Sequence, residues 1–184
     1  IFGTFSDLRF MIDHAKAMGF NAVFLMPLGD VATEDPNRSD SPYSLLSHQS
    51  LDPRYIDWQA LGFGGLSLVQ VLEPFNAQQS TQFTDYPVFI KDTHLNQYAQ
   101  VKAQRIVRLK DAFYPTDYQT VFQIVLMQQY FARRQLEEYI RYAHSQEILI
   151  GTDNPFFMTM EGVEARFNPE ILIRRSDGKI EPAG

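Results

Sequence analysis

The sequence predicts an α/β fold in which helices alternate with short strands buried in a parallel sheet or barrel. Apolar residues recur at helical spacing over residues 8–18, and a continuous apolar run follows over 21–28. A second helical pattern reaches about residue 146 and leads into Ile148-Leu149-Ile150. A helix followed by a short buried strand, found twice, is typical of the αβ units of parallel sheets.

The first helix is expected to begin at Thr4-Phe5-Ser6-Asp7, which has the spacing of a capping box. Gly19 provides the left-handed position that ends such a helix. The strand that follows carries no charged side chain over 21–28, so it is expected to be buried on both faces. A long loop is predicted for residues 29–57, and loops of this length are often functional.

The middle of the chain gives no uniform prediction of secondary structure. Three glycines interrupt residues 58–95, and the stretch 66–72 fits either a helix or a strand. Residues 95–113 predict a helix, and Thr116 with Gln119 has the spacing of a second capping box before the long helix to residue 146. Gln129 interrupts the apolar face of that helix. Near the C-terminal end, residues 171–179 predict a hairpin because Asp177-Gly178 is a strong turn signal.

Composition excludes several classes of function. The 184 residues suffice for one domain with a hydrophobic core, and the net charge of −6 offers no basic surface to nucleic acid or an anionic membrane. Cysteine is absent, which removes disulfides and thiol chemistry and suits a cytoplasmic protein. No apolar run is long enough to span a membrane. The four histidines lack metal-ligand spacing and are expected at the surface, and no cofactor motif is present.

The acidic stretch from Asp30 to Asp40 is expected to be a solvated loop, since its spacing does not fit a calcium-binding EF-hand. Trp58 is expected to anchor the core rather than to hold a ligand. The glycines at 62, 64 and 65 neither follow a buried strand nor open a clear helix, so they do not form a phosphate cradle.

Two ordered sets of motifs resemble the 4-α-glucanotransferases, the amylomaltases or disproportionating enzymes of glycoside hydrolase family 77. The first set combines a strand end at Pro27-Leu28-Gly29, the loop Asp40-Ser41-Pro42-Tyr43, and Asp52-Pro53, where the family usually has Asn. The second set comprises Arg134-Gln135, Tyr142-Ala143-His144, Ile148, Ile150, Asp153, Pro155, Asn168-Pro169-Glu170 and Asp177-Gly178. Residues 58–115 carry little of the resemblance.

The resemblance implies the N-terminal part of a (β/α)₈ TIM barrel of the α-amylase clan, with an inserted, mainly helical subdomain. On this interpretation residues 1–57 are a first barrel segment, 58–115 the insertion and 116–184 a second segment. It also implies a retaining transferase that moves α-1,4-glucan segments between maltooligosaccharides, in starch or glycogen metabolism, by a covalent intermediate. The family's catalytic carboxylates follow later strands and have no counterpart in this chain, which alone is expected to be inactive.

Substrate contact is therefore the role expected of this chain, with an α-glucan or maltooligosaccharide as partner. Tyr43 matches the family tyrosine that stacks on a glucosyl ring; without the resemblance it is a packed aromatic after a turn. Ser41 either bonds a sugar hydroxyl or stabilises its own turn. Asp153 matches an aspartate that helps to hold the sugar, and it also suits a turn before Pro155.

Two departures keep other functions open. Met160-Glu161 stands where the family commonly has His-Asp, and Glu164 stands in place of a second Asp. A degenerate, non-catalytic glucan-binding barrel is one alternative. The other is a hydrolase or branching enzyme of the α-amylase clan, which the stretch 51–55 resembles, although the Asn-His that usually follows its aspartate is absent after Asp153.

Overall fold

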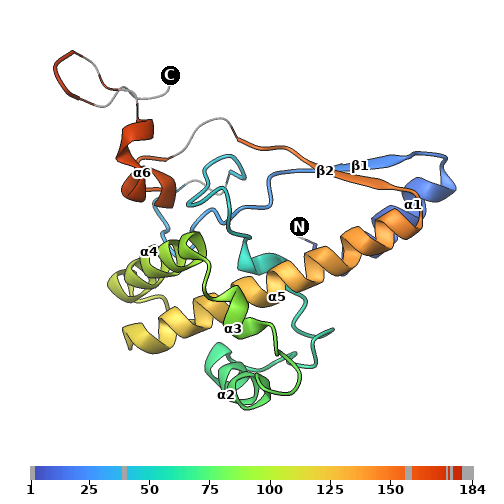
Figure 1. Cartoon of the computed structure of the whole chain (residues 1–184), viewed down its shortest axis with the longest axis horizontal. Helices are drawn as coiled ribbons and strands as arrows, with labels where there is room; N and C mark the ends of the chain where they lie inside the picture. The colour runs from blue at the N-terminus through green and yellow to red at the C-terminus, as the bar shows by residue number, and fades with distance from the viewer. Residues whose placement is uncertain (1–2, 39–40, 156–158, 173, 175, 180–184) are drawn as a thin grey trace.

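A computed structural model describes residues 3–38, 41–155, 159–172, 174 and 176–179 (Figure 1). Helices and strands occur in the order α1 (Asp7–Ala17), β1 (Ala22–Leu25), α2 (Leu68–Gln78), α3 (Tyr86–Phe89), α4 (Thr93–Leu109), α5 (Tyr118–Ser145), β2 (Leu149–Thr152) and α6 (Val163–Phe167). Two single 3₁₀ turns, η1 (Pro53–Tyr55) and η2 (Pro169–Ile171), complete the described elements.

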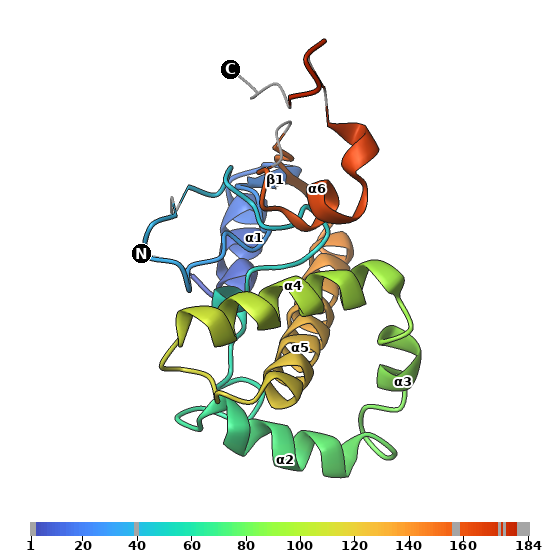
Figure 2. The ribbon, with the colours of Figure 1, turned by 90° about the vertical axis from the view of Figure 1, so that its left-hand side faces the viewer.

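Helix α5 is the axis of the molecule. Its 28 residues extend about 42 Å at 1.5 Å per residue. The C-terminal part lies beside α1 and β2, whereas the N-terminal part is crossed by α4 and lies against α2 (Figures 1 and 2). One helix therefore connects the strand region to the helical region, and it fixes the position of each relative to the other.

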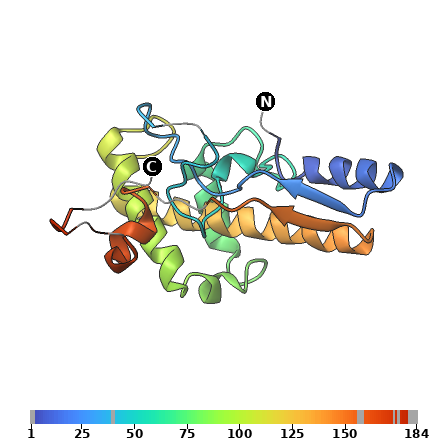
Figure 3. The same ribbon diagram turned by 90° about the horizontal axis from the view of Figure 1, so that it is seen from above.

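The two strands form a parallel pair, as the alternating pattern predicts. Ala22 lies opposite Leu149 and Leu25 opposite Thr152, with α1 and α5 alongside (Figure 3). The expectation that the first strand is buried on both faces is wrong, because Phe24 is 80% exposed; Leu149 on β2 is 65% exposed. Among the described residues no second layer covers the outer face of this pair.

Helix starts follow local side-chain chemistry, but not always at the expected residue. The prediction of a second capping box is wrong, because Asp117, not Thr116, is the N-cap of α5. Asp117 Oδ2 accepts hydrogen bonds from the Thr120 amide at 2.8 Å and from the Thr120 hydroxyl at 2.7 Å. A carboxylate at this position is also favoured by the helix dipole. The expected box at α1 is wrong as well: Ser6, not Thr4, is the N-cap and its side chain makes no cap bond, although the Thr4 amide donates to Asp7 Oδ2 at 2.6 Å.

The ambiguous middle of the chain is helical. Ser67 and Gln70 form a complete capping box at the start of α2. The helix expected at 95–113 begins at Thr93, capped by Asp92, and ends at Leu109 because Lys110 turns left-handed with φ 55°. Of the expected hairpin, the structure describes the turn over 176–179 with Gly178 at φ 79°; residues 173 and 175 lie outside the described residues.

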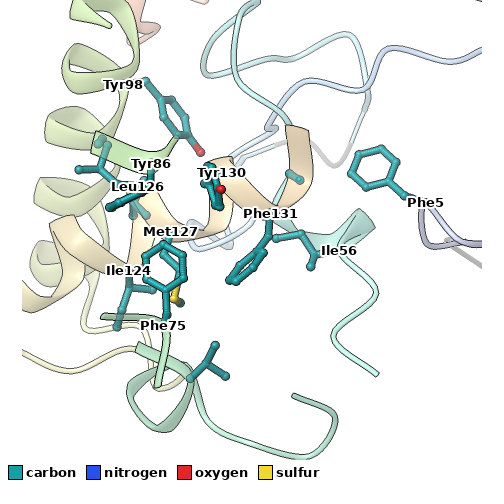
Figure 4. Close-up of a cluster of buried hydrophobic side chains, with 14 of the residues drawn as sticks. Phe5, Ile56, Phe75, Tyr86, Tyr98, Ile124, Leu126, Met127, Tyr130 and Phe131 are labelled. Atoms are coloured by element: carbon teal, nitrogen blue, oxygen red, sulfur yellow. The ribbon is translucent and has the colours of Figure 1, made fainter. Parts of the chain in front are cut away.

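Aromatic side chains fill the helical half of the core (Figure 4). Phe75 of α2 meets Tyr86 edge-on with ring centroids 4.8 Å apart, and Phe131 of α5 at 5.2 Å. Tyr130 of α5 meets Tyr86 at 5.2 Å. These offset and edge-to-face geometries are the favourable ones for aromatic pairs, so the cluster joins α2 and α3 firmly to α5.

Two glutamines on α5 explain the interruption of its apolar face. The side-chain amide of Gln129 donates to the carbonyl of Leu51 at 2.6 Å and accepts from its N–H at 2.9 Å. Gln135 makes the same pair of bonds with Asp57, both at 3.0 Å. Each glutamine is only 5% exposed. Its side-chain amide bonds the N–H and the carbonyl of one loop residue, as a neighbouring β-strand would. The long loop is thereby attached to the central helix at two points.

Replacing Gln129 by Ala removes both bonds to Leu51 and leaves its backbone groups without a partner. We expect the free energy of unfolding to fall by about 1–3 kcal/mol. Urea denaturation followed by circular dichroism measures this. The control is Gln123→Ala, since Gln123 is exposed on the same helix. Equal effects of the two substitutions would show that the amide clamp contributes nothing.

Candidate functional site

Tyr43 and Asp153 come together at the C-terminal end of the strand pair. The Tyr43 hydroxyl donates to Asp153 Oδ2 at 2.7 Å, across 110 residues of sequence. Asp153 directly follows β2, and its amide still donates to the Leu25 carbonyl at 3.0 Å. Tyr43 comes from the loop after β1 and is 44% exposed. A phenol ring and a carboxylate thus form an open polar and aromatic corner.

The hydrogen bond to Asp153 keeps the Tyr43 phenol in its neutral, donating form. This bond, together with partial burial and the negative charge of the carboxylate, raises the pKa of Tyr43 above its ordinary value of 10.0. At neutral pH the pair therefore presents a neutral ring edge and carboxylate oxygens that can accept further hydroxyl donors.

Ser41 shapes the turn that carries Tyr43. Its Oγ accepts from the Tyr43 amide at 3.3 Å, and its carbonyl accepts from the Ser44 amide at 2.9 Å. The turn-stabilising role of Ser41 is thus present in the structure. Contact of the same hydroxyl with a ligand stays a prediction.

Gly29 allows the loop to fold back closely upon itself after β1. A Cβ atom at this position would lie 2.7 Å from Leu45 Cδ1 and 2.9 Å from the Ser47 carbonyl oxygen. Gly29 also pairs with Leu51 in an antiparallel bridge. The Pro-Leu-Gly strand end therefore has a steric reason for its glycine, because any side chain there would push the loop away from β1.

The expectation of a solvated acidic loop is wrong for Asp30, Glu34 and Asp35. Lys102 Nζ of α4 lies 2.8 Å from Asp30 Oδ2 and 2.5 Å from Glu34 Oε2. Arg105, one turn further, contacts Glu34 and Asp35, each at 3.1 Å. The side chains of Asp30 and Glu34 are 1% and 2% exposed. The carboxylates are buried because α4 supplies two cations that compensate their charge.

Asp30 is the most heavily bonded group of this ion cluster. Burial raises the pKa of its carboxyl, but the charge and hydrogen bond of Lys102, the Tyr98 hydroxyl and the Ala32 amide lower the pKa by more. The net pKa of Asp30 lies below its ordinary value of 3.8. The carboxylate therefore stays charged and holds the start of the loop against α4.

Glu164 holds the middle of the loop. Its Oε1 accepts from the Ser47 hydroxyl at 2.7 Å and from the His48 amide at 2.9 Å. His94 Nε2 approaches the same oxygen at 3.2 Å, and the His94 side chain is 18% exposed, so its expected surface position is wrong. The first residues of α4, the loop and α6 meet at this carboxylate, which accounts for the burial of the histidine.

Glu161, the other departure from the family pattern, faces the ion cluster. Arg105 donates to its Oε2 at 2.9 Å and Arg38 at 3.5 Å. Both substituted glutamates therefore contact the base of the loop rather than the Tyr43–Asp153 pair.

Sequence reasoning missed His48 and Asn154 as neighbours of this site. His48 Nδ1 lies 3.4 Å from Asn154 Oδ1, beside Asp153. No sequence signal links two polar residues 106 positions apart in loops. In the described part of the chain no three His, Asp or Glu side chains gather as a metal ligand set. None of the helices described there has the length and apolar character that a bilayer crossing requires.

Comparison with known proteins identifies a matching family and two solved structures of similar fold. The profile of a family described as 4-alpha-glucanotransferase matches residues 2–121 and 74–182. Among curated proteins, no sequence matches this chain. An amylomaltase from Streptococcus agalactiae, determined in complex with acarbose, superposes with a TM-score of 0.74 at 18% identity. That match covers 95% of this chain and 44% of the other.

A second solved structure has the same fold. The amylomaltase from Corynebacterium glutamicum superposes with a TM-score of 0.73 at 17% identity, over 92% of this chain and 30% of that one. The chain thus shares its mixed helix and sheet architecture with amylomaltases and spans less than half of the length of either.

Asp30→Asn should lower the free energy of unfolding at neutral pH by about 3–5 kcal/mol, because it leaves a buried cation under-compensated. The depressed pKa sets the sign of the pH dependence. The contribution of Asp30 is present above pH ~4 and is lost as the pH falls through the lower pKa of the folded state.

Urea denaturation between pH 2.5 and 7 tests this expectation. Glu73→Gln is the matched control, since Glu73 is an exposed acid on α2, and we expect it to change stability by less than about 0.5 kcal/mol. An Asp30→Asn variant as stable as the control, or one with unchanged acid sensitivity, would contradict the role of the ion cluster.

Tyr43 should titrate above pH 10, and Asp153→Asn should shift its titration to lower pH, because the amide lacks the negative charge that disfavours the phenolate. NMR of ¹³C-tyrosine-labelled protein follows the Tyr43 ring signal, assigned with Tyr43→Phe. An identical midpoint in wild type and Asp153→Asn would show that the pair does not form in solution.

Proposed function

This chain belongs to the family of 4-α-glucanotransferases, and we propose that it supplies the glucan-contacting loops of such an enzyme. The reaction of the whole protein is the transfer of α-1,4-glucan segments between maltooligosaccharides. The observation that carries this proposal is the 2.7 Å bond between Tyr43 and Asp153, which joins the two family motifs in one corner.

The chemistry of this corner suits a sugar. An exposed phenol ring offers a flat apolar surface to the C–H face of a glucosyl unit. Beside it, the carboxylate of Asp153 and the hydroxyl of Ser41 can bond ring hydroxyls. The clamps from Gln129, Gln135 and the α4 cations hold the loop before any ligand arrives, so little ordering entropy is lost on binding.

The covalent step belongs to residues outside this chain. In a retaining transferase one carboxylate attacks the anomeric carbon and a second carboxyl acts as acid and then base. We propose that both follow later strands of a (β/α)₈ barrel of the α-amylase clan. Within it, residues 1–57 and 116–184 are barrel segments and 58–115 the helical insertion. The exposed outer face of the β1–β2 pair fits such a sheet.

A non-catalytic glucan-binding protein is the second candidate. The observation that favours it is that Glu161 and Glu164 contact Arg105, Ser47 and His48 at the base of the loop rather than the Tyr43–Asp153 pair. Incubating the full-length protein with maltotriose separates the candidates. Transfer yields glucose and longer glucans, a clan hydrolase yields net new reducing ends, and a binding protein retains glucan without either product.

The binding role can be tested on this chain alone by NMR titration with maltotriose. Tyr43→Ala should weaken binding at the Tyr43–Asp153 corner by about tenfold, equivalent to ~1.4 kcal/mol. Tyr43→Phe keeps the stacking ring and should lose less. Phe10→Ala, an exposed aromatic on α1, is the matched control. Unchanged affinity in Tyr43→Ala would remove the basis of the proposal.

A further inference from the structure

A polar cavity of about 530 Å³ opens between α4 and α6, which lie against each other (Figure 2). Three arginines line it, Arg105 and Arg108 on α4 and Arg166 on α6. We call it the arginine cavity. Tyr43 and Asp153 do not line it, so it is separate from the corner at the strand ends. Its volume lies within the range of small-molecule sites, about 300–1,000 Å³.

Local structure brings the two arginines of α4 to the same side of the helix. Arg105 and Arg108 are three positions apart, and residues at this spacing are neighbours on a helix surface. Arg166 lies in the last turn of α6. The fold therefore brings three guanidinium groups from two helices to one cavity, in a chain whose net charge is −6.

Arg105 is held in place by carboxylates that lie outside the wall of the cavity. Its Nε donates to Glu34 and its Nη2 donates to Asp35, both at 3.1 Å. Its Nη1 donates at 2.9 Å to Glu161, which belongs to the wall. Two nitrogens of the guanidinium group are thus anchored to the loop, and the third is a fixed donor on the side of the cavity.

The other two arginines have no carboxylate partner. In the part of the chain that the structure describes, the guanidinium groups of Arg108 and Arg166 form no hydrogen bond and no ion pair. Both residues are exposed. The wall of the cavity therefore holds three guanidinium groups and a single carboxylate, that of Glu161. An anion that entered it would meet an excess of positive charge.

Glu161 is the group that an entering anion would replace. Its side chain is 64% exposed, whereas that of Arg105 is 7% exposed. A carboxylate in contact with water can move aside at small cost, because exposed ion pairs contribute little to stability. Arg105 would keep its bonds to Glu34 and Asp35 and would offer Nη1 to the ligand.

We propose that the arginine cavity binds the phosphate group of a small phosphate monoester. Guanidinium groups bind phosphate through paired N–H donors, and one phosphate has enough oxygens for several arginines. The volume of the cavity leaves room for an organic group beside the phosphate, and Met160 in the wall offers that group an exposed apolar side chain. The proposal does not rest on the proposed function, because the cavity shares no residue with the Tyr43–Asp153 corner.

The test is an NMR titration of the labelled chain with inorganic phosphate and with phenyl phosphate, at constant ionic strength. We expect phenyl phosphate to shift the amides around Arg108 and Arg166 and to bind more tightly than inorganic phosphate. Arg108→Ala and Arg166→Ala should each weaken binding by about tenfold, because each removes a charged donor. The matched control is Arg141→Ala, since Arg141 is exposed on α5 and does not line the cavity.

Glu161→Gln should have the opposite effect. It removes the carboxylate of the wall, so both phosphates should bind about fivefold more tightly. A residue that only maintained the fold would not increase affinity when it is replaced. Arg108, Glu161 and Arg166 are all exposed, so circular dichroism of the three variants should match that of the wild type.

Several outcomes would contradict the proposal. The phosphate site is overturned if neither probe shifts amides at the cavity, or if Arg108→Ala and Arg166→Ala bind as tightly as the control. Equal affinities for the two probes would overturn the monoester and restrict the site to inorganic phosphate. Acetate that shifts the same amides as strongly would overturn the selectivity for phosphate. Weaker binding by Glu161→Gln would overturn the replacement of Glu161 by the ligand. The proposed function stands in each of these cases.

Discussion

The structure depends on buried ion pairs between α4 and the loop after β1. Lys102 and Arg105 could not lie inside the molecule alone, and neither could Asp30 and Glu34, because burying an uncompensated charge costs several kcal/mol. Together they form a cluster in which the carboxylates are almost fully buried. This mutual requirement converts an acidic stretch that would otherwise be solvated into the base of an ordered loop.

The remaining attachments of the loop act on the same principle, since each satisfies polar groups that burial would leave unbonded. Gln129 and Gln135 on α5 bond the loop backbone, and Glu164 accepts hydrogen bonds from the Ser47 hydroxyl and the His48 amide. The loop has little regular secondary structure, yet it has a defined path. This path allows Tyr43, near the middle of the loop, to reach the carboxylate of Asp153, which directly follows β2.

The departures from the family pattern gain a physical meaning in this arrangement. Glu161 lies 2.9 Å from Arg105 and so extends the ion cluster toward the surface. Glu164 reaches three groups with one oxygen, and a shorter aspartate would not span the same distance. The longer side chains maintain the loop, and neither of them contacts the Tyr43–Asp153 pair.

The sequence by itself determined the αβ order, the parallel pair of strands and the long helix, and its motifs singled out Tyr43 and Asp153, because periodicity and ordered motifs are local signals. Only the tertiary structure decided that Asp30 is buried, that Phe24 is exposed and that the Tyr43 hydroxyl bonds Asp153. These outcomes depend on which distant group supplies the compensating charge, hydrogen bond or covering surface, and such partners lie up to about a hundred residues apart, where sequence spacing carries no distance.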